Sequence, residues 1–452
     1  MSITSDLVDF TVALKFKDLS PEAVQSTKKA VVDTIGVALA GSSAAGVEPA
    51  VELTRQWGGK PESTVLVYGD RMPVFQSAFV NSMMAHALDF DDIHDKTPVH
   101  ASCSVVPTAL AMSECLGGVD GKAFITSIVL GIEVASRLGL SILDPERGWH
   151  LSAVCGTVGN AVVAGKLLGL NPNKMLNALG IAYSQASGTL QSQADGTLTK
   201  RMQPGFAARS GIFSAFLAQK GLTGPAHFLD GKFGFFNLFF GNKCAPEAIT
   251  DKMGSHFEIN NLGSKAYPCC LLAHTAIDAI LNLIAEEEFS LDELQSIDVS
   301  GSSAMDTLCG KPYRISDSSE IDAQFSLQYL LILTIMKRWI RIDDFSSEAV
   351  RDPEILAHTD KVRIHVSPKI NNRWGAIVKV EKKNGKILTE RVDIPKGQPQ
   401  NPMTWDEYEK KFKSCANYAA KPLKQKNLDQ FVRHIEDLET IDNVNTLLGL
   451  LI

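Results

Sequence analysis

The segment Pro21-Glu-Ala-Val-Gln-Ser-Thr-Lys-Lys-Ala-Val-Val-Asp-Thr-Ile-Gly-Val-Ala-Leu-Ala40 decides the fold class of this 452-residue chain. Its apolar residues recur at three- and four-residue spacing, which is typical of a helix with one buried face. Ser20 precedes it as a helix cap, and Pro21 suits the first helical position. The same periodicity continues to about residue 240 and predicts further helices at 74–88, 105–116, 123–138, 152–168, 174–187 and 206–219.

The pattern changes after about residue 290, where apolar and polar residues alternate as they do in half-buried strands. Strands are predicted at 297–300 and 362–366, and a hairpin at 376–394 turns at Asn384-Gly385. Further helices are predicted at 273–286, 323–339, 404–416 and 428–448. We therefore expect a mainly α protein. A large helical domain comprises residues 1–261 and 398–452, and a smaller α+β lid domain, residues 262–397, is inserted into it.

The composition is that of an ordinary globular protein, with 45% hydrophobic and 21% charged residues. The net charge of −7 argues against a nucleic-acid-binding protein. The start of the chain has no secretory signal pattern, and the longest apolar run, Phe325 to Met336, is too short to span a bilayer. The eight cysteines form no CxxC pair, which indicates reduced thiols and a cytoplasmic protein.

The segment His86-Ala-Leu-Asp-Phe-Asp-Asp-Ile-His-Asp-Lys-Thr-Pro-Val-His100 holds three histidines and four aspartates. Helical spacing would place His86 and Asp89 on one face, and Pro98 would send His100 onto a returning loop. The cluster is a metal site, a proton-transfer site or a polar helix end. Aspartates are unfavourable at a helix C-terminus, which argues against the last of these.

A magnesium site is the main metal alternative. Asp91-Asp92-Ile-His-Asp95 matches the DDxxD pattern of helical isoprenoid synthases, which act on diphosphates. The second magnesium motif of that class is missing downstream, and histidine is a poor magnesium ligand. A metal-dependent helical enzyme acting on diphosphates is therefore the remote alternative.

Three further segments contain groups suited to binding anions. Lys200 and Arg201 are predicted on a loop just before a helix start, where backbone N–H groups also favour anions. Lys265 and His274 flank a proline-ended turn at the predicted domain junction. His150 precedes a glycine-rich helix. Taken alone, each also fits an ordinary role, as a surface cation or a capping residue.

Together these segments resemble the MmgE/PrpD family, and the resemblance covers nearly the whole chain. Its most specific part is His86-Ala-Leu-Asp-Phe-Asp-Asp, followed by His100-Ala-Ser and Val106-Pro-Thr-Ala-Leu-Ala. The other matching pieces are Gly148-Trp-His150, Thr199-Lys200, Lys265-Ala-Tyr-Pro and Phe325-Ser-Leu-Gln-Tyr329. The family includes 2-methylcitrate dehydratase, cis-aconitate decarboxylase and iminodisuccinate epimerase.

The resemblance implies a helical domain with an α+β lid, a homodimer, and a reaction that needs no metal or other cofactor. The pocket residues of the decarboxylase-like branch fall on Asp89, His100, His150, Lys200, Lys265 and Tyr329. Two positions depart from that branch: Ile93 replaces a common threonine, and Cys270 replaces a pocket histidine.

We therefore expect a cofactor-independent lyase that acts on a small di- or tricarboxylate by decarboxylation or dehydration. An isomerase or epimerase on a similar substrate is the alternative, and neither a membrane nor a nucleic acid is expected as a partner. His100 is predicted as the acid/base, with Asp89 assisting it and Tyr329 as a second donor. The predicted substrate-binding residues are His150, Lys200, Lys265, Arg201 and His274.

Overall fold

The computed structural model describes residues 2–145, 147–316 and 319–452. The chain divides into two compact units. Unit 1 comprises Met1–Ser264 and Thr404–Ile452, and unit 2 comprises Lys265–Met403. The prediction of a mainly α protein is confirmed, because helices dominate the described residues and the strands form only small sheets.

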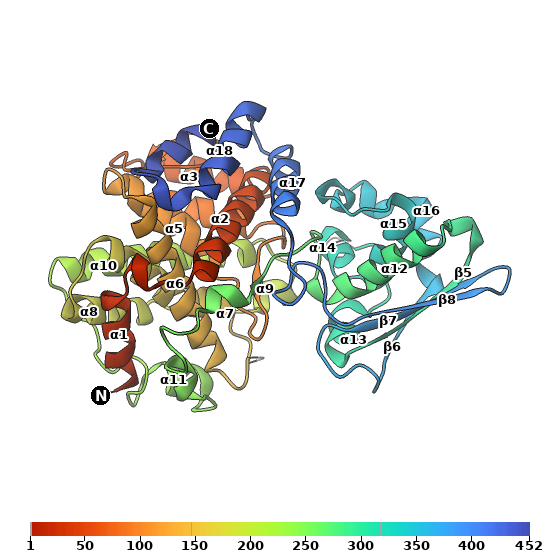
Figure 1. The fold of residues 1–452 in the computed structure, drawn as a ribbon, viewed down its shortest axis with the longest axis horizontal. Helices are drawn as coiled ribbons and strands as arrows, with labels where there is room; N and C mark the ends of the chain where they lie inside the picture. Colours follow the sequence, from red (N-terminus) through yellow and green to blue (C-terminus); the bar gives the residue numbers. More distant parts are fainter. Residues whose placement is uncertain (1, 146, 317–318) are drawn as a thin grey trace. The chain divides into compact units, whose positions relative to one another are not determined.

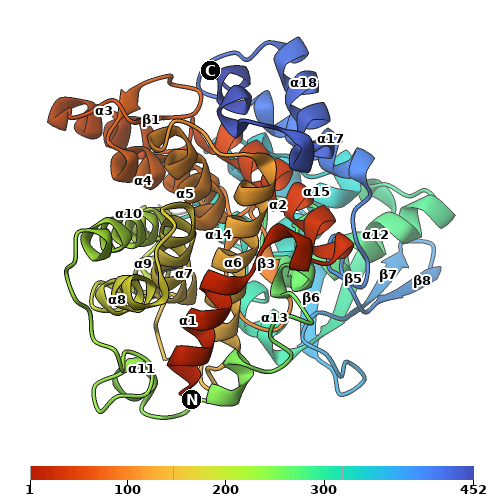
Figure 2. The same cartoon turned by 60° about the vertical axis from the view of Figure 1, so that its left-hand side comes forward.

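Unit 1 is a helical bundle (Figure 2). Its helices are α1 (Ile3–Ala13), α2 (Pro21–Gly41), α3 (Val47–Trp57), α4 (Val74–Ala85), α5 (Ser102–Cys115), α6 (Gly121–Leu140), α7 (Leu151–Leu167), α8 (Pro172–Tyr183), α9 (Gln191–Ala194), α10 (Thr199–Gln219), α11 (Phe235–Phe240), α17 (Trp405–Ala416) and α18 (Gln425–Glu436). As predicted, the Ser20 side chain caps α2 by accepting from the Ala23 N–H.

Small residues let the central helices of unit 1 pack closely. α7 packs against α5, α6 and α10. A Cβ on Gly159 of α7 would come within 2.6 Å of the Gly131 carbonyl oxygen of α6, so only glycine permits this crossing. By length and composition α6 could cross a membrane, but 89% of that stretch is buried inside the protein, as in a core helix.

Two of the helix boundaries in unit 1 that differ from the prediction change the secondary structure in which candidate site residues lie. The helix predicted at 74–88 ends at Ala85, and Asp89 adopts a left-handed backbone conformation with φ +52°. The helix predicted at 206–219 begins at Thr199, so Lys200 and Arg201 lie in its first turn and not on a preceding loop. Pro204 and Gly205 both lie inside α10.

A short strand pair fixes the segment that follows Asp92. β3 (Ile93–His94) pairs antiparallel with β4 (Leu262–Gly263), and the His94 Nε2 lies 3.1 Å from Glu258 Oε2. His94 is 1% exposed, so its role is to anchor this segment.

Unit 2 is an α+β fold. Its elements are α12 (His274–Glu286), β5 (Leu294–Gly301), α13 (Ser303–Cys309), α14 (Ser319–Gln324), α15 (Leu327–Lys337), α16 (Pro353–Leu356), β6 (Val362–Val366), β7 (Ala376–Lys382) and β8 (Ile387–Val392). The strand order is β6-β5-β7-β8, with β5 and β6 parallel and the other pairs antiparallel. α12 packs against β7, β8 and α15 (Figure 1).

The predicted hairpin is confirmed, because β7 and β8 pair across a turn in which Gly385 has φ +82°. The single helix predicted at 323–339 is wrong. It breaks at Ser326, whose extended backbone and side chain cap α15. The helix predicted at 428–448 is also interrupted, since α18 ends at Glu436 and short 3₁₀ turns follow.

Candidate active site

Asp91 holds two histidines of unit 1 through one carboxylate oxygen. Its Oδ2 lies 2.7 Å from His86 Nδ1 and 3.2 Å from His100 Nδ1. Asp91 is fully buried, which disfavours ionisation, but the two imidazoles outweigh burial and hold the pKa of its carboxyl well below the ordinary value. Asp91 is therefore an ionised acceptor that both ring nitrogens face.

The backbone around His100 is fixed on both sides. Its N–H donates to Ser152 Oγ of α7 at 3.0 Å, and its carbonyl accepts from the Cys103 thiol at 3.2 Å. The ring is not sealed, because 11% of the side chain is exposed. A rigid imidazole that solvent reaches suits proton transfer.

His150 is held in a defined orientation by Gln203 of α10. The Gln203 amide donates to the Thr189 carbonyl at 2.9 Å and to Ser192 Oγ at 2.8 Å. Its Oε1 therefore faces His150 Nδ1, at 3.0 Å, and accepts a hydrogen bond from that nitrogen. Burial lowers the pKa of His150 well below its ordinary value, and neighbouring cationic groups lower it further. His150 is thus a neutral imidazole that carries its proton on Nδ1.

His86 lies between the other two imidazoles. Its ring centroid is 5.1 Å from that of His100 and 5.5 Å from that of His150. Burial lowers the pKa of His86 although Asp91 raises it. Three imidazoles from three segments of the chain therefore form one cluster, which we call the histidine cluster.

Lys200 brings a cation to the same region. Its Nζ lies 2.8 Å from Asp89 Oδ1, and its charge acts on both His86 and His150. The left-handed backbone at Asp89 turns its carboxylate towards Lys200, whereas Asp91 faces His100. The structure thus places Asp91 beside His100, and the assisting role predicted for Asp89 stays a prediction. Arg201 points elsewhere and donates to the Ala45 carbonyl at 2.7 Å.

Asp92 is buried behind the histidine cluster and belongs to a different network. Ser102 Oγ donates to its Oδ2. Burial raises the pKa of Asp92 to about 8, and the nearby charges of Asp91 and Asp33 contribute. Asp33 itself pairs with Lys411 of α17 at 2.6 Å. Of the two adjacent aspartates, Asp91 is ionised and Asp92 is protonated.

Replacing Asp92 by asparagine is expected to flatten the pH dependence of stability. In the unfolded chain this carboxyl loses its proton near pH 3.8, whereas the folded protein keeps it until about pH 8. The free energy of unfolding therefore falls as pH rises through this window. In Asp92→Asn the amide still accepts from Ser102 but cannot ionise. Between pH 5 and 8 the unfolding temperature of the variant should rise relative to that of the wild type as pH increases. A difference in unfolding temperature that stays constant over this range would contradict the prediction.

His86, Asp91 and Cys103 also lie close enough to hold a metal ion, with their ligand atoms within 4.8 Å of one another. Each of these side chains already makes a hydrogen bond or accepts one. Asp91 accepts from imidazoles, and Cys103 donates to the His100 carbonyl. Burial raises the pKa of the Cys103 thiol well above its ordinary value, so the sulfur is not the thiolate that a metal requires. The donor set fits a hydrogen-bonded cluster better than a metal centre.

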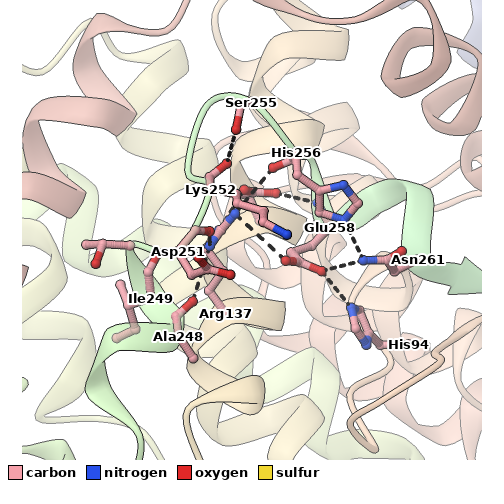
Figure 3. A network of polar contacts seen from close by, with 12 residues as sticks. His94, Arg137, Ala248, Ile249, Asp251, Lys252, Ser255, His256, Glu258 and Asn261 are labelled. Atoms are coloured by element: carbon pink, nitrogen blue, oxygen red, sulfur yellow. Dashed lines mark hydrogen bonds and ion pairs between the residues drawn. The ribbon is translucent and has the colours of Figure 1, made fainter.

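A cavity of about 360 Å³ lies elsewhere in unit 1, beside the network drawn in Figure 3. The buried charged side chains that line this cavity already form hydrogen bonds with other protein groups. Arg137 donates to Glu133 at 2.7 Å and to carbonyls of the loop at 248–256. Glu258 accepts from Asn261 at 2.7 Å and lies 3.1 Å from His94. This network explains how the loop is held, and the histidine cluster remains the stronger candidate site.

Three predicted site residues belong to unit 2. Tyr329 is 0% exposed, packs against Tyr313, and donates its hydroxyl to the Asp344 carbonyl at 2.6 Å. These are the contacts of a core residue, and its role as a proton donor stays a prediction. His274 is buried at the start of α12, 5.0 Å from the Tyr267 ring. Lys265 is 2% exposed, and its carboxylate-binding role also stays a prediction.

Sequence reasoning missed Gln203 and gave His86 and Asp91 no part in the chemistry. Gln203 carries no charge and lies within an apolar helix, so nothing in its pattern marked it. The two-residue spacing of Asp89 and Asp91 was visible, but choosing between them required the backbone turn at Asp89.

Comparisons with known proteins cover the whole chain. The model of the MmgE/PrpD N-terminal domain matches residues 5–247, and that of the MmgE/PrpD C-terminal domain matches residues 267–437. Cis-aconitate decarboxylase of Aspergillus terreus is 28% identical over 471 residues, which cover 99% of this chain and 96% of that protein. Human cis-aconitate decarboxylase is 28% identical over 465 residues, with 99% and 94% covered.

A more distant relative has a different activity in its name. The 2-methylcitrate dehydratase of Cupriavidus necator is 23% identical over 391 residues, which cover 82% of this chain and 78% of that enzyme. Since the two domain models together span both structural units, the chain belongs to the MmgE/PrpD family, as its sequence predicted.

Proposed function

We propose that this protein is a lyase that acts on a small di- or tricarboxylate related to aconitate or methylcitrate. Relatives over nearly the full length are named cis-aconitate decarboxylase, and more distant ones are named 2-methylcitrate dehydratase. Both names describe lyases. The higher identity to the decarboxylases favours loss of CO2 over loss of water.

The observation that carries the proposal is the histidine cluster with Lys200 beside it. Three imidazoles and one ammonium group stand within a protein whose net charge is −7. Imidazoles suit proton transfer, and an ammonium group suits binding of a substrate carboxylate and stabilises negative charge that develops on it.

The chemistry needs a proton carrier close to a carbon next to a carboxylate. In a decarboxylation the C–CO2 bond breaks, its electron pair stays on the substrate carbon, and His100 in its imidazolium form delivers a proton there. In a dehydration neutral His100 removes the proton, and hydroxide leaves and is protonated to water. In both cases negative charge builds on the remaining carboxylate, where Lys200 would stabilise it.

A product screen tests the proposal. The purified protein is incubated with cis-aconitate, 2-methylcitrate and iminodisuccinate, and the products are followed by proton NMR. Loss of CO2 or of water from one of the tricarboxylates is the expected result. A change of stereochemistry or double-bond position alone would establish the alternative, an isomerase or epimerase. No reaction with any polycarboxylate would overturn the proposal.

We expect turnover to be independent of added metal. His86 and Asp91 are hydrogen-bonded to each other, and the Cys103 thiol donates to the His100 carbonyl and is not a thiolate. Dialysis against a strong chelator should therefore leave kcat within about twofold of the untreated protein. Elemental analysis of the same samples is the control. A stoichiometric ion whose removal abolishes turnover would support the metal-dependent alternative instead.

A further inference from the structure

One carboxylate oxygen, Oδ2 of Asp91, serves two imidazoles, at 2.7 Å from His86 Nδ1 and 3.2 Å from His100 Nδ1. An ionised carboxylate only accepts hydrogen bonds, so His86, which is hydrogen-bonded to Asp91, carries its proton on Nδ1. His100 Nδ1 lies at ion-pair distance from the same oxygen without a hydrogen bond to any described residue, and the negative charge beside it favours a proton on that nitrogen. Each ring turns its other nitrogen, Nε2, away from Asp91, so a single buried charge favours the same tautomer in both histidines.

The Nε2 atom of His86 is buried and has no hydrogen-bond partner within residues 2–145, 147–316 and 319–452. Leaving a buried polar atom without a partner costs about 1–3 kcal/mol, so such atoms are rare and call for an explanation. A purely structural histidine would be expected to use both nitrogens. His86 instead uses one nitrogen on Asp91 and packs its ring between His100 and His150.

We propose that Asp91 and His86 are a pair of positioning residues that set the tautomer and the charge balance of His100. Asp91 orients the His100 ring and stabilises the imidazolium that forms when the ring takes up a proton. His86 donates a hydrogen bond to the same carboxylate, which reduces the negative charge that Asp91 presents to His100. Asp91 therefore favours the His100 imidazolium less strongly than it would alone. This inference rests on the proposed function, in which His100 is the proton carrier.

The other charged and titratable groups around this pair come from several elements of unit 1. Lys200 of α10 and His150 at the start of α7 act on His86, while Cys103 and Asp92 lie beside Asp91. Asp92 is protonated near neutral pH, and the Cys103 thiol is neutral. Asp91 is therefore the one full negative charge among the groups named here that directly contacts His100.

Two substitutions should move the pH–rate profile in opposite directions. Asp91→Asn removes the charge that stabilises the imidazolium, so the midpoint controlled by His100 should move to lower pH. His86→Phe keeps a ring of similar size but removes the hydrogen bond from His86 to Asp91, so the carboxylate then interacts with His100 only. The midpoint controlled by His100 should therefore move to higher pH. Each shift should be about one unit or more. The direction is the same whether His100 acts as an acid or as a base.

The magnitudes should differ as well. In Asp91→Asn the amide oxygen can still accept from the imidazoles but carries no negative charge to stabilise the imidazolium, so kcat should fall by about 10²–10⁴-fold with KM changed far less. Asp92→Asn, which alters the neighbouring carboxyl without touching either histidine, is the matched control and should keep the wild-type pH profile. General damage to the fold would not produce opposite shifts in two variants.

A measurement without substrate separates this inference from the proposed function. Protein labelled with ¹⁵N-histidine shows, in long-range ¹H–¹⁵N spectra, which ring nitrogen carries the proton. His86 and His100 should both be protonated on Nδ1 in the wild type. Protonation of either on Nε2 alone, or Asp91→Asn turnover within about threefold of wild type, would overturn the inference. Absence of turnover on every polycarboxylate would overturn the proposed function instead.

Discussion

Replacing His100 by alanine is expected to lower kcat by about 10²–10⁴-fold while the protein still folds. The imidazole is the acid/base of the proposed reaction, and the alanine that replaces it has no group that could carry the proton. Its backbone is held by Ser152 and Cys103 through main-chain atoms, which the substitution leaves in place. Steady-state kinetics on the substrate found in the product screen measures the loss.

Circular dichroism and thermal unfolding of His100→Ala provide the control. The side chain is 11% exposed and Asp91 keeps its contact with His86, so the variant should unfold at a lower temperature but still cooperatively. An unchanged fold with near-wild-type turnover would contradict the assignment of His100. His150 would then be the next candidate, because its Nδ1 proton is fixed by Gln203.

Replacing Lys200 by methionine is expected to raise KM by about 10–100-fold, with a smaller effect on kcat. A hydrogen bond to a charged partner contributes about 1.5–3 kcal/mol, which corresponds to this range. Methionine keeps the length and packing of the side chain but removes the cation. Initial rates over a wide range of substrate concentration separate the effect on KM from that on kcat.

The double variant Asp89→Asn/Lys200→Met shows which partner Lys200 serves. The single substitution leaves the Asp89 carboxylate, 2.8 Å away in the wild type, without its cation, and that negative charge would itself repel an anionic substrate. If Lys200 binds substrate, KM should stay high in the double variant. A return to the wild-type KM would mean that Lys200 only neutralises Asp89.

The sequence predicts the fold class well because its signals are local. Helical periodicity marks α2, α6 and α12, capping residues mark the starts of α2 and α6, and Asn384-Gly385 marks the hairpin. Helix ends are harder to predict. α10 runs through Pro204 and Gly205, since packing against α4, α7 and α8 outweighs their poor helix propensity.

The residue types of the candidate site are also visible in the sequence, but their partners are not. His86, His100 and His150 were all noted, yet their proximity depends on how α4, α5 and α7 pack. The choice between Asp89 and Asp91 depends on one left-handed residue, which no periodicity reveals. Tyr329 illustrates the reverse case, since a motif suggested chemistry where the contacts are those of a buried core residue.

The most direct test of the central claim, proton transfer at a carbon beside a carboxylate, is proton NMR of the reaction in D2O. Wild-type protein incubated with cis-aconitate and 2-methylcitrate should place solvent deuterium on one carbon next to a carboxylate, in the product or in recovered substrate. His100→Ala should slow this incorporation by the same factor as turnover. Products formed without any carbon-bound deuterium, or incorporation unaffected by His100→Ala, would contradict the account.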